Sequence, residues 1–244
     1  MSKTLIFAFG LAIFCGTALN TDAVATESVA QAVSATQPPV LDGWLDDACW
    51  QDAAPLGNFH VTKPAPGRRV DDTEFRLAYD DAWLYLGIKC RNPLQKLVMD
   101  PKTREHDGPV PGDESVEMFF LSDGEGKVYY HFMLSCFNIK AEQRGVNGVR
   151  ERQGWNPPWR SAVVIDDEGW TAEVALPLYI FMEYGDLEHI WFNIARNRRQ
   201  PYVDESNVIT HEELELSIWR PVKQSFHETA AFGALAPLTP GRLR

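Results

Sequence analysis

Residues 112–138 read GDESVEMFFLSDGEGKVYYHFMLSCFN, and the alternation within this stretch decides the fold. Counted in twos, its apolar side chains fall on one side: Val116, Met118 and Phe120, then Tyr130, Phe132, Leu134 and Cys136. The other side is mixed and includes Glu117 and His131. Two alternating runs around a glycine-containing turn predict an antiparallel hairpin with one apolar face. A hairpin cannot bury such a face alone, so a second sheet must cover it.

The same period-two alternation recurs along most of the chain. Runs of this kind occupy residues 73–79, 83–90, 159–165, 170–176, 190–196, 215–219 and 232–235. Short helical turns are expected at 47–51 and 178–184, and polar loops at 140–158 and 197–213. Strands this frequent, separated by turn residues, are typical of a sandwich or barrel. We therefore predict an all-β fold, an antiparallel β-sandwich of jelly-roll or immunoglobulin-like type with short helical turns.

The beginning of the chain carries the features of an export signal. Lys3 provides a basic start, residues 5–14 are apolar, and Ala23-Val24-Ala25 fits a cleavage site. We predict a signal peptide over residues 1–25, a flexible leader over 26–39 and one domain over 40–244. No later stretch is long and apolar enough to span a bilayer, so we expect a secreted or periplasmic protein.

The charge balance restricts the classes of partner. The formal net charge is −11, which argues against nucleic acid and anionic membranes as main partners. Three cysteines follow the predicted signal, Cys49, Cys90 and Cys136, and their spacing fits no zinc motif. A Cys90–Cys136 disulfide and three small buried thiols both stay open.

The sequence contains no nucleophile elbow, phosphate-binding loop, zinc-protease motif or EF-hand pattern. The best catalytic candidates are two glutamates in mid-strand positions, Glu117 and Glu173. They would form a glycosidase pair only if their carboxyl groups lie about 5–9 Å apart. The alternative is that each pairs with an arginine such as Arg196 or lines a binding face.

Aromatic residues point more strongly to binding. Four of them lie at strand ends or in loops: Trp155, Trp159, Trp219 and Phe226. Sugar rings pack their C–H groups on aromatic faces, while carboxylates and arginines bond the hydroxyl groups. Such rings beside Glu117 and Arg196 would suit a carbohydrate. The alternative for each ring is that it caps the core of the sandwich.

The order of these landmarks resembles the family 9 carbohydrate-binding module and its wider, DOMON-like group of secreted sandwiches. The resemblance covers most of residues 41–238. Its motifs are LDG at 41–43 with Trp50, FRLAY at 75–79 followed by WLYL at 83–86, DESVEMF at 113–119, WTAEVALP at 170–177, WFNIAR at 191–196, SIW at 217–219, and Phe226-His227 leading into Phe232-Gly233.

The resemblance implies a sugar site and its residues. In sugar-binding members two aromatic rings clamp the terminal sugar of a glycan, and calcium ions sit at structural sites. The two ring positions fall here at Pro111 and Phe226, so half of the clamp is missing and the other half is altered. Glu117 matches the family's hydroxyl-binding carboxylate, and Met133 stands where an arginine can serve. Arg196 ends the FNIAR motif and is expected to point into the same site.

We predict an exported, non-catalytic module that binds a glycan or glycoside. Its predicted site residues are Glu117, Trp159, Arg196, Trp219 and Phe226, with Trp159 as a candidate replacement ring. The alternative from another class is an accessory interaction module or a haem-binding electron-transfer sandwich, with Met133 and His131 as axial ligands. Haem is the weaker cofactor hypothesis, and calcium rests on the resemblance alone. A third hypothesis is carbohydrate hydrolysis by Glu117 and Glu173.

Overall fold

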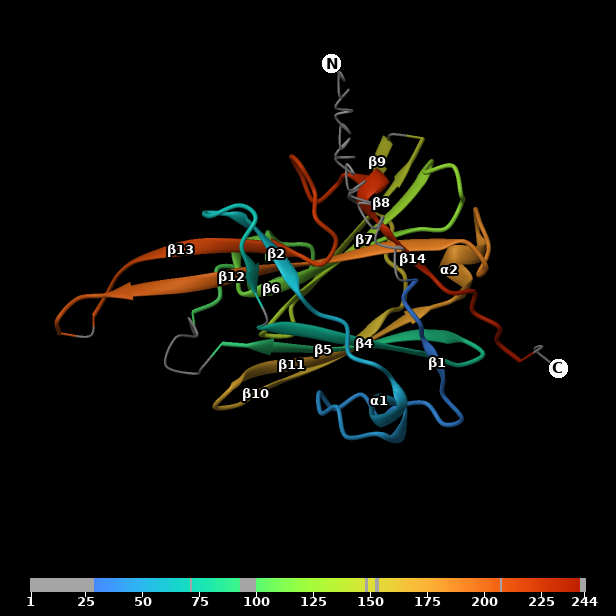
Figure 1. The fold of residues 1–244 in the computed structure, drawn as a ribbon, viewed down its shortest axis with the longest axis horizontal. Helices are drawn as coiled ribbons and strands as arrows, with labels where there is room; N and C mark the ends of the chain where they lie inside the picture. Colours follow the sequence, from blue (N-terminus) through green and yellow to red (C-terminus); the bar gives the residue numbers. More distant parts are fainter. Residues whose placement is uncertain are drawn as a thin grey trace, which may run out of the picture.

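The computed structural model describes residues 29–70, 72–92, 100–147, 149–151, 154–206 and 208–241. The signal peptide predicted over residues 1–25 lies outside this part of the chain. Two β-sheets stack face to face, with short helical segments at their margins (Figure 1). The prediction of an all-β sandwich is therefore confirmed.

The larger sheet contains nine strands within the described residues. From edge to edge they are β3 (Arg69–Val70), β2 (Phe59–Lys63), β13 (Ile209–Ile218), β12 (Ile190–Val203), β6 (Ser115–Leu121), β7 (Val128–Ser135), β8 (Lys140–Val146) and β9 (Val149–Glu151). The remaining strand, β14 (Gly233–Leu235), pairs with β12. All of these pairings are antiparallel.

The smaller sheet covers one face of the larger one. Its strands run in the order β1 (Val33–Ser34), β4 (Thr73–Tyr79), β5 (Trp83–Arg91), β11 (Gly169–Pro177) and β10 (Arg160–Ile165). The helical segments are α1 (Ala48–Asp52), α2 (Tyr179–Met182), and the 3-10 turns η2 (Val110–Gly112) and η3 (Thr229–Ala231). In the part of the chain that the structure describes, no helix is long and apolar enough to cross a membrane.

The hairpin predicted over residues 112–138 is the β6–β7 pair inside the larger sheet. Its apolar side lies in the core between the sheets: Val116, Met118, Phe120, Tyr130, Phe132, Leu134 and Cys136. The register sets Glu117 opposite Met133 and Phe119 opposite His131. Because successive side chains of a strand alternate, these four point to the outer face of the larger sheet. The hairpin thus fills the core with one face and offers a mixed polar and aromatic surface with the other.

Two stretches predicted as polar loops are strands instead. β8 and β9 cover most of residues 140–151, and β12 and β13 extend across most of 197–213. β9 is the sheet edge, and the outer parts of β12 and β13 form a ribbon that reaches past the sandwich (Figure 1), where no apolar face is required. Polar side chains join the ribbon to the rest of the domain: Arg199 binds Glu212 at 2.6 Å and Asp113 at 3.2 Å.

Residues 29–39 differ from the flexible leader that the sequence predicts. Ala30 is buried, its N–H donates to the carbonyl of Ala234, and its carbonyl accepts from the N–H of Ala236. A few residues later, β1 pairs in parallel with β4. Small side chains suit a linker, but they also let a backbone approach a sheet edge closely. The ordered structure of the domain therefore begins before residue 40.

The cysteines of the described chain are buried free thiols. Burial raises the pKa of Cys90 to about 12 and that of Cys49 to about 11. Both therefore stay protonated at neutral pH and act as small apolar residues. The sequence left open a Cys90–Cys136 disulfide or three buried thiols, and the structure has the three thiols.

Candidate functional site

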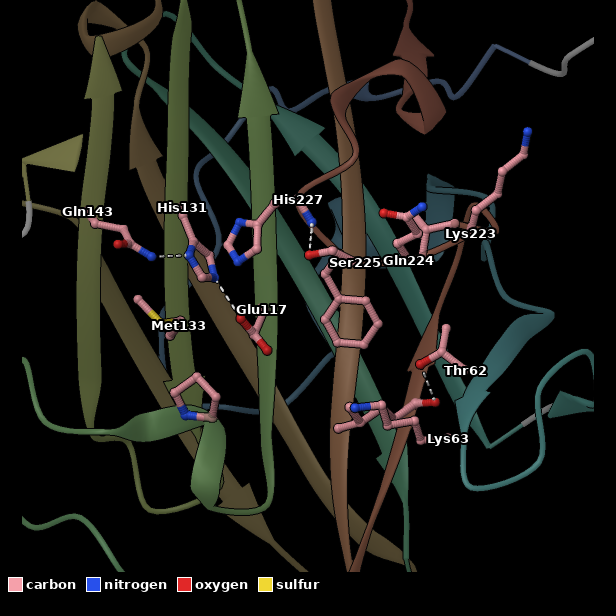
Figure 2. Close-up of a pocket in the computed structure, with 14 residues that line it drawn as sticks. Thr62, Lys63, Glu117, His131, Met133, Gln143, Lys223, Gln224, Ser225 and His227 are labelled. Atoms are coloured by element: carbon pink, nitrogen blue, oxygen red, sulfur yellow. Dashed lines mark hydrogen bonds and ion pairs between the residues drawn. The ribbon is translucent and has the colours of Figure 1, made fainter. Parts of the chain in front are cut away.

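A pocket of about 550 Å³ opens on the outer face of the larger sheet. Neighbouring strands supply one side of it: Glu117 from β6, His131 and Met133 from β7, and Gln143 from β8. Pro111 of η2 lies beside β6 and β7, and the other side comes from Thr62 and Lys63 of β2, Leu216 of β13 and residues 222–227. Figure 2 shows Gln143, His131 and Glu117 in a row, with His227 beside them.

Glu117 is the one acidic side chain that lines this pocket among the described residues. It is only 6% exposed, and each of its carboxylate oxygens has a donor. His131 lies 2.8 Å from Oε2, and Asn197 donates to Oε1 at 2.8 Å. Burial by itself would raise the pKa of Glu117, but the hydrogen bonds and charges of His131, Asn197 and His227 outweigh it and lower the pKa. The pocket therefore contains a carboxylate that stays ionised near neutral pH.

His131 holds this carboxylate in position. Its ring stacks on Phe119, with centroids 4.3 Å apart and planes 20° apart. Gln143 lies 2.6 Å from Nδ1 on the side away from Glu117. With the amide N–H of Gln143 donating to Nδ1, the ring N–H that faces Glu117 is the one on Nε2. One stacked ring and two hydrogen bonds thus fix the orientation of the acceptor.

A single carboxylate binds three backbone N–H groups of the loop that closes the pocket, residues 222–227. Glu228 accepts from the backbone N–H of Lys223 at 3.0 Å, of Ser225 at 2.8 Å, and of Gln224. These backbone donors lower the pKa of Glu228. The capped loop carries Phe226, whose ring meets the edge of Phe119 at a centroid distance of 6.3 Å.

Two of the five predicted site residues, Glu117 and Phe226, line the pocket, and Pro111 and Met133 do as well. Arg196 does not. It pairs across the sheet with Val116 and not with Glu117, so its side chain enters the space between the sheets. There it is 1% exposed, and its Nη2 lies 2.7 Å from the Glu114 carboxylate. Side chains alternate between the two faces along β12, and this alternation, not the charge of Arg196, decides which face it occupies.

The two predicted tryptophans also lie away from this pocket. Trp219 is 7% exposed and stacks on Phe192 in the core, with ring centroids 5.0 Å apart. Trp159 is buried as well, and its indole N–H donates to Glu142 at 2.8 Å in a different hollow of the surface. The alternative reading of these rings, as caps of the core, fits their burial.

The structure separates the two carboxylates of the hydrolase hypothesis. Glu173 belongs to β11 of the smaller sheet, and its oxygens accept from the backbone N–H groups of Asp42 and Gly43 and from the indole of Trp50. Glu117 lies on the outer face of the other sheet, so the core stands between them. The pairing of Glu117 with Glu173 for catalysis is therefore wrong.

Haem and calcium both stay predictions, and the described residues show what each would meet. Both ring nitrogens of His131 are engaged in hydrogen bonds, so an axial bond to haem would displace one of them. Calcium prefers roughly six to eight oxygen ligands. One group within the described residues gathers metal-ligating atoms, His106, Asp107 and Glu142, and it includes an imidazole nitrogen that calcium does not favour. Calcium at a structural site stays a prediction from the resemblance.

Sequence reasoning missed the partners of Glu117. The signal for His131 was nevertheless present, because the hairpin register places it diagonally across from Glu117 on the same face. Gln143 and Asn197 had no comparable signal, since they come from strands that the sequence presents as polar loops.

A pocket with a fixed, ionised carboxylate on the outer face of an antiparallel sandwich defines a ligand-binding β-sandwich domain. The family described as "Carbohydrate family 9 binding domain-like" matches residues 41–236, and the chain belongs to this family.

Solved structures share the fold. One from Bacteroides uniformis has a TM-score of 0.59 at 18% identity and covers 84% of this chain and 95% of its own. A family 9 carbohydrate-binding module from Caldicellulosiruptor kristjanssonii, in complex with glucose, has a TM-score of 0.54 at 14% identity. The match covers 84% of this chain and 91% of that module. A family 9 module from this organism in complex with cellotriose has a TM-score of 0.56 at 16% identity. The match covers 86% of this chain and 95% of that module. The search of curated proteins found no match.

Proposed function

We propose that this chain is a non-catalytic carbohydrate-binding module whose pocket over β6 and β7 binds a glycan or glycoside. The observation that carries the proposal is the Glu117 carboxylate, buried, ionised and held by His131 and Asn197 at the pocket surface. Family membership supports it, as do the similar folds solved with glucose and cellotriose.

The pocket offers both halves of sugar recognition. Glu117 retains lone pairs that accept from sugar hydroxyl groups, and hydrogen bonds to a charged acceptor are stronger than neutral ones. Phe226 offers an apolar ring on the opposite side, and Lys63, Gln224 and Ser225 add polar groups at the margin. The family resemblance assigns Pro111 to one of the two ring positions of the clamp, so one ring is missing and we expect weak binding, with Kd on the order of micromolar to millimolar.

We also propose that the domain acts outside the cytoplasm. The basic start at Lys3, the apolar run over 5–14 and the Ala23-Val24-Ala25 site support export with cleavage near Ala25. A mass measurement on protein secreted by a bacterial host tests this, because cleavage removes the first 25 residues and retention leaves the full mass.

The proposal is tested by calorimetric titration of the protein with glucose, cellotriose and a panel of other mono- and oligosaccharides. We expect saturable binding to at least one of them, weakened roughly 10- to 100-fold by Glu117→Gln, which removes the charge of the acceptor. Phe226→Ala should remove detectable binding, whereas Tyr179→Ala, which trims an exposed ring distant from the pocket lining, should not. Flat heats across the panel, or equal affinity in all variants, would contradict the proposal.

A further inference from the structure

A second hollow, of about 470 Å³, lies where β8 meets the segment before β10. Among the described residues it shares no lining side chain with the pocket that contains Glu117. Glu142 and Gln143 are neighbours on β8 and point to opposite faces of the sheet, Glu142 into this hollow and Gln143 into the first pocket. The two sites are therefore separate.

At this second hollow the Glu142 side chain is buried, with 3% exposure, and only one of its two carboxylate oxygens has hydrogen-bond partners. Its Oε2 accepts from the Trp159 indole at 2.8 Å and lies 3.1 Å from Nε2 of His106. Its Oε1 is buried and has no hydrogen-bond partner among the described residues. A buried carboxylate oxygen without a partner is costly, so it calls for a group that the chain itself does not supply.

Two further ligand atoms lie beside this carboxylate. One ligand atom each from His106, Asp107 and Glu142 fall within 4.8 Å of one another, and His106 Nε2 is 3.8 Å from Asp107 Oδ1. Their loop is fixed to β8, because the N–H of Asp107 donates to the carbonyl of Lys140 at 3.0 Å. The side chains of His106 and Asp107 are both partly exposed, which leaves a route for an ion to enter.

The cations that line the same hollow are directed elsewhere. Lys140 donates to the carbonyl of Trp159 at 3.1 Å and lies over its ring, and Arg104 donates to Asp100 at 3.2 Å. Neither therefore neutralises Oε1 of Glu142.

We propose that His106, Asp107 and Glu142 form a binding site for a divalent transition metal, with Zn²⁺ as the reference ion. One imidazole and two carboxylates, with a side open to water, are a ligand set that zinc accepts. The imidazole disfavours calcium and magnesium, which prefer oxygen ligands only. Bound metal would connect the loop of residues 100–114 to β8 and to Trp159, whose indole N–H orients the Glu142 ligand.

The test uses protein without a polyhistidine tag, stripped with a chelator and titrated with Zn²⁺ alone by calorimetry. Co²⁺ absorption then reports the ligand field, and tryptophan fluorescence reports the contact of Trp159 with Glu142. We expect one saturable site, weakened at least about 10-fold by His106→Ala and by Glu142→Gln. The matched control is His189→Ala, which removes another histidine, paired with Asp186 at 3.0 Å on the surface, and should change nothing.

His106 is partly exposed, so its substitution leaves the fold intact even if Glu142→Gln does not. The proposal is overturned if Zn²⁺ does not bind saturably, if His106→Ala binds as tightly as the parent, or if His189→Ala removes the binding. It is also overturned if Ca²⁺ binds the same site more tightly than Zn²⁺. Each outcome is independent of whether the first pocket binds a carbohydrate.

Discussion

At the scale of single residues, the site depends on one carboxylate whose charge is stabilised by its neighbours. A glutamate as buried as Glu117 would ordinarily favour its neutral form. His131 and Asn197 reverse that preference by donating to both oxygens, and Gln143 sets the tautomer of His131 that makes this possible. The acceptor for a sugar hydroxyl is therefore oriented before any ligand arrives, which reduces the entropy lost on binding.

The lowered pKa of Glu117 predicts a pH dependence of stability. The ordinary value is 4.5 and the folded value lies below it, so the stability that Glu117 contributes is fully present above pH 4.5. It is lost as the pH falls from 4.5 through the folded pKa. Urea unfolding of the parent and of Glu117→Gln should give a constant difference from neutral pH down to about pH 5, and a shrinking one below. A difference that stays constant as the pH falls below 4.5 would contradict this assignment to Glu117.

At the scale of elements, the loop over the pocket owes its shape to its own cap. Glu228 receives backbone N–H groups from Lys223, Gln224 and Ser225, which keeps Phe226 facing the sheet. The end of the loop is also held by the contact of His227 with Tyr129 and of Phe226 with Phe119, whereas residues 223–225 are exposed and depend on the cap.

Removing the cap should therefore affect binding more than folding. In Glu228→Ala the three N–H groups turn to water and the loop populates other conformations, so we expect affinity for the best saccharide to fall about 3- to 10-fold. Thermal unfolding should change little, because the donors are exposed. Glu205→Ala, at another exposed turn, serves as the control. Unchanged affinity in Glu228→Ala would show that the loop is held by something else.

A second element, the segment around α1, is held to the smaller sheet by Glu173. Three donors converge on its carboxylate, from Asp42, Gly43 and Trp50. Glu173→Ala leaves them without an acceptor in a buried place, so we expect the free energy of unfolding to fall by about 2–4 kcal/mol. Glu168→Ala removes an exposed glutamate that pairs with Lys89 and should cost less than about 1 kcal/mol. A small effect of Glu173→Ala in denaturant unfolding would contradict this role.

At the scale of the whole molecule, period-two alternation was enough to predict the sandwich and its central hairpin. The alternation is visible only where the buried face is apolar, so it fails in β8, whose buried side chains include the charged Glu142, and in the outer part of β12, which extends past the sandwich. It also does not reveal what a polar residue meets across the core: Arg196 matches a family motif, yet its partner is Glu114 between the sheets. Glu117 and Phe226 were found from motif position, whereas their supports depend on strand register, which the sequence did not make visible.

The most direct test of the central claim is chemical-shift mapping of ¹⁵N-labelled protein during titration with cellotriose and with glucose. The pocket over β6 and β7 predicts that the shifted amides gather around Glu117, His131 and residues 222–227. The smaller sheet around Glu173 should be unaffected. Shifts that gather instead around Trp159 and His106, or no shifts with any saccharide of the panel, would contradict the account.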